Sequence, residues 1–86
     1  MYKIIKKELL APNIYRMDIA APRVACSAKP GQFIILRLDE KGERIPLTVA
    51  DYDAAEGWVT IVTQTVGYST TKLCAMNPGD ELADFA

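Results

Sequence analysis

The sequence predicts a small all-β protein, an antiparallel barrel of about six strands with one short helix. Apolar and polar residues alternate with a period of two along most of the chain, as they do in half-buried strands. Proline and glycine stand singly between these stretches and mark turns, and 86 residues suffice for one domain. The composition, 50% hydrophobic and 24% charged residues, is that of a folded globular chain.

The first two predicted strands form a hairpin. Residues 2–10 alternate weakly, and residues 13–20 alternate clearly, with Met17 on one face and Asp18 on the other. Ala11-Pro12-Asn13 lies between the two stretches and is a turn signal. Two alternating segments joined by so short a turn indicate neighbouring antiparallel strands.

The next two strands are separated by a charged loop. Residues 32–38 follow the turn signal Pro30-Gly31, and both faces of this segment are largely apolar, as in a strand closed into a barrel. After the loop at residues 39–43, residues 44–50 resume extended structure. Because proline cannot donate to a ladder, Pro46 indicates an edge, a bulge, or a strand that turns away from its neighbour.

The fifth strand is the clearest, since residues 58–66 are rich in β-branched side chains. The pattern changes at Gly67, where hydroxyl groups suited to a helix N-cap begin. One short helix is predicted over residues 68–76, and Asn77-Pro78-Gly79 ends it. Residues 81–86 begin a last strand.

Charge and residue counts exclude several classes of function. Ten Lys and Arg against eleven Asp and Glu give a net charge of −1, so no global field exists to hold nucleic acid or an anionic membrane. The absence of histidine excludes histidine-based triads and imidazole metal ligands. Cys26 and Cys74 lack CxxC spacing and cannot build a metal site alone, so we interpret them as reduced structural thiols.

The two ends of the chain carry further expectations. The N-terminus lacks a signal-peptide apolar region and no apolar run is long enough for a membrane span, which favours a cytoplasmic protein. The chain stops at Phe85-Ala86 without a polar tail, which suggests a fragment of a longer protein. We expect such a fragment to expose an apolar surface and an unpaired strand edge, and therefore to self-associate.

Four motifs carry the functional interpretation by their order. Pro-Gly-Gln-Phe leads into the third strand, Arg-Ile-Pro-Leu-Thr-Val-Ala-Asp follows the charged loop, Gly-Tyr-Ser-Thr opens the helix, and Pro-Gly-Asp follows it. In this order the sequence resembles, over essentially all 86 residues, the flavin-binding domain of the ferredoxin–NADP reductase superfamily. Within it, the sequence is most similar to the electron-transfer subunit of dihydroorotate dehydrogenase and the small subunits of NADH-dependent ferredoxin–NADP reductase and sulfide dehydrogenase. The resemblance implies a six-stranded Greek-key barrel with one capping helix that binds FAD.

The resemblance also implies which residues contact the flavin. Leu47 would pack on the isoalloxazine face, and Thr48 would place a hydroxyl or N–H near the redox-active nitrogen. Residues 67–70 correspond to the family's Gly-x-Gly-Thr segment, where N–H groups and hydroxyls at a helix start stabilise a pyrophosphate. With the middle contact on the fifth strand included, the predicted cofactor-binding residues are Arg44, Ile45, Pro46, Leu47, Thr48, Val62, Thr63, Gln64, Gly67, Ser69 and Thr70.

The sequence departs from the family pattern at Arg44. Relatives place an arginine immediately before the proline, whereas here Ile45 precedes Pro46. Neighbouring residues of a regular strand face opposite sides, so either a bulge near Pro46 returns Arg44 to the phosphates or the helix start carries the charge with less help. We therefore expect the hydroxyls of Ser69 and Thr70 to contribute more to FAD affinity than Arg44 does.

The resemblance implies one domain of an NAD(P)H-dependent flavoprotein oxidoreductase. An NAD(P)-binding domain and a segment with a [2Fe-2S] cluster would follow residue 86 and pass electrons to a partner subunit. The flavin carries the chemistry, so this domain needs no catalytic residue, and alone it would be inactive. Two alternatives stay open: a flavin reductase that works without a partner subunit, and a non-redox barrel that binds an oligonucleotide or a protein. Taken singly, Leu47 is most simply a core residue, and Ser69 and Thr70 are most simply helix caps.

Overall fold

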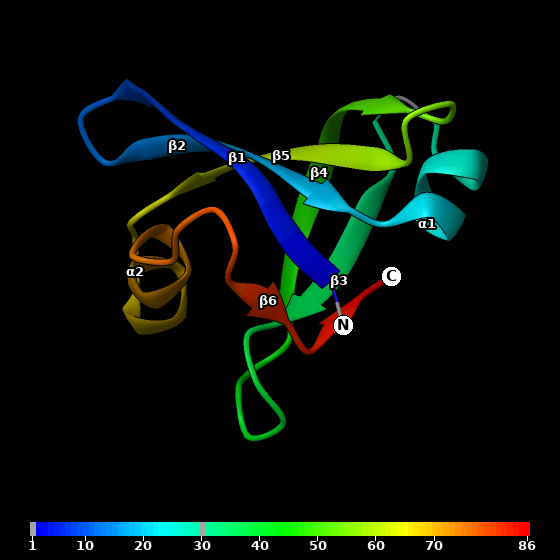
Figure 1. The fold of residues 1–86 in the computed structure, drawn as a ribbon. Helices are drawn as coiled ribbons and strands as arrows, with labels where there is room; N and C mark the ends of the chain where they lie inside the picture. The colour runs from blue at the N-terminus through cyan, green and yellow to red at the C-terminus, as the bar shows by residue number, and fades with distance from the viewer. Residues whose placement is uncertain (1, 30) are drawn as a thin grey trace.

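The computed structural model describes residues 2–29 and 31–86 (Figure 1). Seven strands form one antiparallel sheet in the order β6-β1-β2-β5-β4-β3-β7, and two short helices accompany it. The elements in chain order are β1 (Tyr2–Ala11), β2 (Ile14–Ala20), α1 (Pro22–Ser27), β3 (Phe33–Arg37), β4 (Ile45–Asp53), β5 (Trp58–Gln64), α2 (Tyr68–Cys74), β6 (Glu81–Leu82) and β7 (Asp84–Phe85).

The last segment of the chain closes the sheet into a barrel. β6 pairs with β1 and β7 pairs with β3, and only Ala83 separates the two short strands. The Ala83 N–H donates to the Arg37 carbonyl at 3.0 Å, and the rings of Tyr2 and Phe85 lie 6.0 Å apart across the closure. The predicted final strand is thus one segment bent at Ala83. It bridges the two ends of the sheet, and each of its two short strands pairs along one edge, β6 with β1 and β7 with β3.

The connection from β2 to β3 gives the barrel its Greek-key order, because β5 and β4 lie between these two strands in the sheet. This connection contains α1, a six-residue helix that the sequence analysis did not predict. The helix has Pro22 in its first turn but no side-chain cap, so it carries only a weak sequence signal. Gly57, with φ of +79°, packs against it, since a Cβ there would lie 3.2 Å from Pro22.

Side chains of the strands fill the barrel, and burial alternates with the predicted period of two along β3 but not along β2, where three successive residues are buried. On β2, the apolar Met17 and Ile19 are completely buried. Asp18 between them is buried too, where it accepts a 2.6 Å hydrogen bond from the Thr60 hydroxyl on β5. The other fully buried large apolar residues are Ile4, Ile34, Leu36, Val59, Ile61, Leu73, Leu82 and Phe85.

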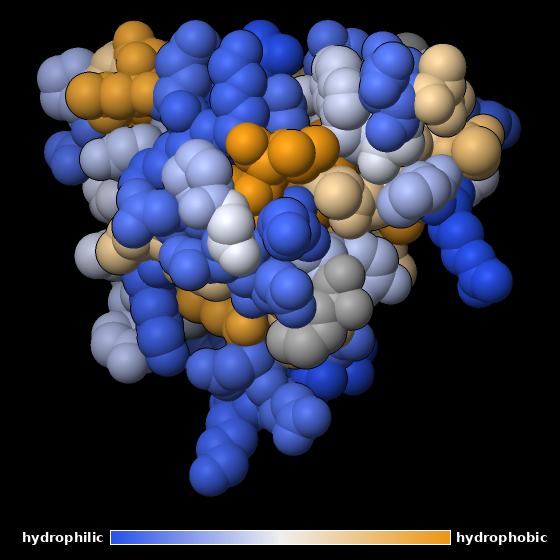
Figure 2. Space-filling view, viewed as in Figure 1, coloured by the Kyte–Doolittle hydropathy of each residue, from blue (hydrophilic) through white to orange (hydrophobic). Residues whose placement is uncertain are grey.

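Some apolar side chains remain on the surface. Figure 2 shows hydrophobic side chains gathered at the end of the β1–β2 hairpin, where Leu9 and Leu10 are 62% and 50% exposed. Within the described part of the chain, neither helix is long and apolar enough to cross a membrane.

Candidate functional site

β4 and β5 separate at one end of the sheet. Their ladder ends at the pair Val49↔Ile61, next to a register shift in β4. Beyond that pair, residues 45–48 of β4 pair with β3, and residues 62–64 of β5 pair with β2. In the described structure these two segments do not pair with each other. The resulting opening therefore has predicted site residues on both of its sides.

The backbone of β4 directs polar groups into this opening. Ile35 exchanges both of its backbone hydrogen bonds with Ala86 of the last segment, at 2.9 and 3.0 Å. The pair Ile35↔Pro46 is therefore a non-hydrogen-bonded pair of the β3–β4 ladder, and the Pro46 nitrogen faces away from β3. Because strand residues repeat with a period of two, the N–H of Thr48 also points away from β3. Pro46 thus stands where a strand has no neighbour to receive an N–H, as its sequence position indicated.

The β3–β4 register is regular around the proline. Ile45 to Thr48 pair in unbroken succession with β3, and the register shift of β4 lies after Val49. The bulge near Pro46 that could have returned Arg44 to the site is absent from these described strands. Arg44 nevertheless lines the groove, because it is exposed at the end of the loop that precedes β4.

One groove of about 350 Å³ lies between the start of β4 and the start of α2. A hollow of about 230 Å³ on the outer face of β3 and β4 shares Pro46 with it. The groove is lined by Glu43, Arg44, Ile45, Pro46, Val66, Gly67, Tyr68, Ser69 and Thr70. The hollow is lined by Phe33, Pro46, Leu47 and Thr48. Together they contain eight of the eleven predicted cofactor-binding residues.

The three remaining predicted residues lie on β5 and have different surroundings. Val62 and Gln64 are exposed beside the opening, whereas Thr63 points into the barrel and is buried. Leu47 of β4 is half-buried and packs against the hydrophobic core, although it also lines the hollow. Its interpretation as a core residue therefore holds alongside the proposed contact with a ligand.

The Thr70 hydroxyl closes the turn that begins α2. It accepts hydrogen bonds from the N–H groups of Val66 and Gly67 at 3.1 and 2.9 Å and lies 3.2 Å from the Gly67 carbonyl, to which it donates. Gly67 is therefore the N-cap, and Thr70 caps the turn from the third position of the helix. The interpretation of Ser69 as a cap was wrong, since its hydroxyl bonds to Glu43 instead. The first residues of a helix lack intrahelical acceptors, so the N–H groups of Tyr68 and Ser69 stay available at the groove.

The charged loop is tied to α2 by two contacts. The Ser69 hydroxyl donates to the Glu43 carboxylate at 3.0 Å, and the Lys72 ammonium lies 3.5 Å from the Asp39 carboxylate. Arg44 makes no ion pair within residues 2–29 and 31–86. Glu43 was not among the residues predicted from the sequence, since a charged residue in a loop carries no motif and its partner Ser69 lies 26 positions away.

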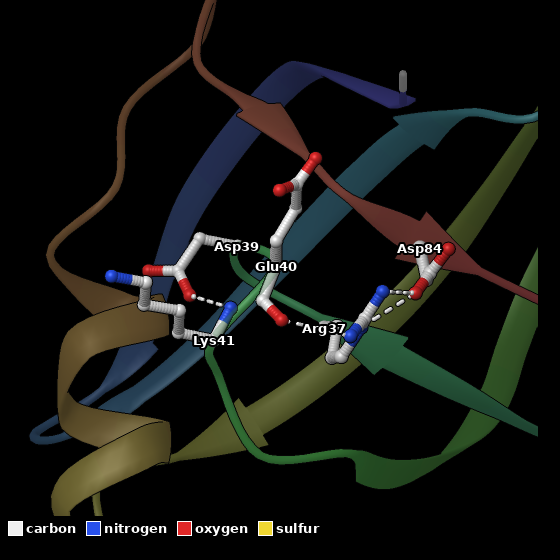
Figure 3. A network of polar contacts seen from close by, with 5 residues as sticks. All are labelled: Arg37, Asp39, Glu40, Lys41 and Asp84. Atoms are coloured by element: carbon white, nitrogen blue, oxygen red, sulfur yellow. Dashed lines mark hydrogen bonds and ion pairs between the residues drawn. The ribbon is translucent and has the colours of Figure 1, made fainter.

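The base of the same loop is fixed by a second polar network, drawn in Figure 3. Arg37 binds Asp84 of β7 and donates from Nη1 to the Glu40 carbonyl at 3.0 Å. Asp39 accepts a 3.0 Å hydrogen bond from the Lys41 N–H. This bond, with a smaller contribution from the charge of Lys72, lowers the pKa of the Asp39 carboxyl below its usual value. The loop is thus held between the last strand and α2.

Comparison with known proteins identifies relatives of the chain, although no protein-family model matches it. The chain is 67% identical over 85 residues to an uncharacterized protein from the adh 3′ region of Clostridium beijerinckii, covering 99% of this chain and 29% of that protein. It is 44% identical over 82 residues, 95% of its length, to the Thermotoga maritima homolog of the dihydroorotate dehydrogenase B (NAD(+)) electron transfer subunit, again 29% of the relative. The chain is thus similar, over nearly its whole length, to about a third of such an electron transfer subunit.

A solved structure shows the same similarity in its fold. The whole chain superposes with a TM-score of 0.96 and 42% identity on 31% of a chain of the NADH-dependent reduced ferredoxin-NADP oxidoreductase, a structure that concerns flavin-based electron bifurcation. The resemblance inferred from the ordered motifs is thereby confirmed. The antiparallel barrel is confirmed too, with seven strands and two helices in the described residues where six and one were expected. The chain spans about a third of the length of these relatives, all subunits of oxidoreductases where their names state a function.

Proposed function

We propose that the groove between β4 and α2 holds FAD in an oxidoreductase electron transfer subunit. One observation carries the proposal. The sheet opens beyond Val49↔Ile61, and this opening brings residues 44–48 and residues 67–70 around one groove and its adjoining hollow. The ordered motifs assign the same two segments to the flavin and its pyrophosphate.

The residues at the groove suit the chemistry of a flavin dinucleotide. An arginine without an ion-pair partner can bind phosphate oxygens through two parallel hydrogen bonds, and we propose this role for Arg44, which lines the groove. The N–H groups of Tyr68 and Ser69 add donors for the same anion. The adjoining hollow offers apolar surface from Phe33 and Leu47 to a planar ring, with the Thr48 N–H directed into the opening.

The location of these groups changes the expected ranking of the phosphate contacts. The Thr70 hydroxyl is already engaged by the backbone of its own turn, and the Ser69 hydroxyl is engaged by Glu43. Arg44 lines the groove with no ion pair in the described structure. We therefore now expect Arg44 to contribute more to FAD affinity than either hydroxyl.

Bound FAD would supply the redox chemistry, taking two electrons from NAD(P)H and passing them on singly. This domain would then bind and orient the cofactor and exclude water from it. We further propose that other parts of the full-length protein bind NAD(P)H and a [2Fe-2S] cluster, and that a partner oxidoreductase subunit exchanges electrons with it. The names of the relatives support this role, since they are electron transfer subunits of larger enzymes.

Titration of the flavin-free, full-length protein with FAD, followed by flavin fluorescence, tests the proposal. We expect binding by the wild type and a loss of about tenfold in affinity for R44A, as for removal of a charged hydrogen-bond partner. Arg23, exposed on α1, provides the matched control, because R23A removes the same charge elsewhere. A protein that is purified colourless and takes up no added FAD would refute the proposal, as would equal effects of the two variants.

A further inference from the structure

The Glu43–Ser69 hydrogen bond stands where two depressions of the surface meet. The groove of the proposed site and a second hollow of about 410 Å³, between the charged loop and α2, share Glu43, Tyr68 and Ser69 in their linings. The bond joins the loop to the helix across this shared boundary at 3.0 Å.

Glu43 brings a negative charge to a groove that otherwise suits an anion. Within the described residues its carboxylate has no ion-pair partner, and the Ser69 hydroxyl is a neutral donor. Glu43 is exposed and Ser69 is half-buried, and the bond between them is open to solvent, so it can exchange for bonds to water or to a ligand. The loop has two further attachments, because Asp39 pairs with Lys72 and the Glu40 carbonyl accepts from Arg37.

We propose that Glu43 is a charge gate of the groove, an inference that rests on the proposed binding of FAD. When the Glu43 carboxylate accepts the hydrogen bond from the Ser69 hydroxyl, as in this structure, its negative charge repels an incoming pyrophosphate. A bound dinucleotide displaces it, and Ser69 then becomes a donor for the phosphate oxygens. Glu43 thereby lowers the affinity for phosphate-bearing flavins and leaves the affinity for a flavin without phosphate unchanged.

The test compares two ligands and two variants on the flavin-free, full-length protein. E43Q removes the charge and keeps an oxygen that accepts from Ser69. E56Q makes the same change of net charge in the exposed β4–β5 turn, at the other end of these strands. Dissociation constants for FAD and for riboflavin, which has no phosphate, are measured by fluorescence at low salt and at about 1 M salt. At the higher concentration, interactions between charges are screened beyond about 3 Å.

We expect E43Q to bind FAD about fivefold more tightly than the wild type at low salt, as for removal of one repulsive charge near a phosphate in water. This gain should shrink at high salt, riboflavin affinity should stay within about twofold, and E56Q should match the wild type. Unchanged or weaker FAD binding by E43Q, or equal tightening for riboflavin, would overturn the gate while leaving the proposed function standing. If neither the wild type nor E43Q binds FAD, the proposed function and the gate fall together.

Discussion

The Arg37 guanidinium and the Asp84 carboxylate join β3 to the last strand through two donors on one oxygen. Nε and Nη2 of Arg37 lie 2.6 and 2.5 Å from Oδ2 of Asp84. The arginine side chain is 26% exposed and the aspartate 49%, so solvent screens the pair in part. Its geometry matters more than its charge, because the planar fork fixes β7 where the barrel closes and leaves Nη1 for the Glu40 carbonyl.

R37A should lower the free energy of unfolding by about 1 kcal/mol, because it removes charged hydrogen bonds that water compensates in part. Urea unfolding followed by tryptophan fluorescence measures this loss. R37K keeps the charge but not the fork, so it should recover less than half of the loss. Full recovery by lysine would show that charge alone holds the closure.

T70A should destabilise the protein by about 1 kcal/mol, since it leaves the N–H groups of Val66 and Gly67 without their acceptor. T70S retains a hydroxyl in the same place and should remain close to the wild type. Thermal unfolding of both variants provides the comparison. Equal stability of T70A and T70S would mean that this hydroxyl does not cap α2.

D39N should change how stability depends on acid. The pKa of the Asp39 carboxyl is lowered in the folded protein. Its contribution to the free energy of unfolding is therefore fully present above the pKa that this carboxyl has in the unfolded chain, and it is lost as the pH falls through the pKa in the folded protein. The wild type should therefore exceed D39N in stability at neutral pH, and the difference should vanish in strong acid. Denaturant midpoints across this pH range measure it, and a difference independent of pH would contradict the prediction.

Cys26 should react with a thiol reagent much faster than Cys74. Cys26 is exposed on α1, whereas Cys74 is buried, and burial raises the pKa of the Cys74 thiol. Both access and the fraction of reactive thiolate are therefore reduced at Cys74. C26S should abolish the fast phase of labelling in the native protein, and C74S should leave it intact. A fast phase that persists in C26S would place Cys74 at the surface.

The strands were predictable because each one carries its own signal. The period of two marks residues 14–20, and β-branched side chains mark residues 58–64. Both signals are local in sequence, and the structure has a strand at each place. The helix α1 was missed because six residues without a cap bond leave little pattern to detect. The bend at Ala83 and the contact of Glu43 with Ser69 depend on neighbours distant in sequence, so no local pattern encodes them.

The candidate site divides in the same way. Its two segments, residues 44–48 and 67–70, were predictable because each is a short motif of neighbouring residues that can be recognised in the sequence. The presence of Arg44 at the groove was not, because Arg44 lies in the loop that precedes β4 and outside the alternation of that strand. The Thr70 hydroxyl is already bonded to the backbone of its own turn. The sequence indicates only that a threonine is a suitable capping residue there, not that its hydroxyl is engaged.

The bend at Ala83 also has a consequence for how the protein is made. β1 leaves the ribosome before the other strands of this barrel, but one of its two neighbours is β6, near the other end of the barrel in sequence. Until residues 81–85 emerge, β1 keeps one edge of unpaired backbone groups, and so does β3. During synthesis the nascent chain therefore carries two open sheet edges at once, and both are removed in a single late step of folding.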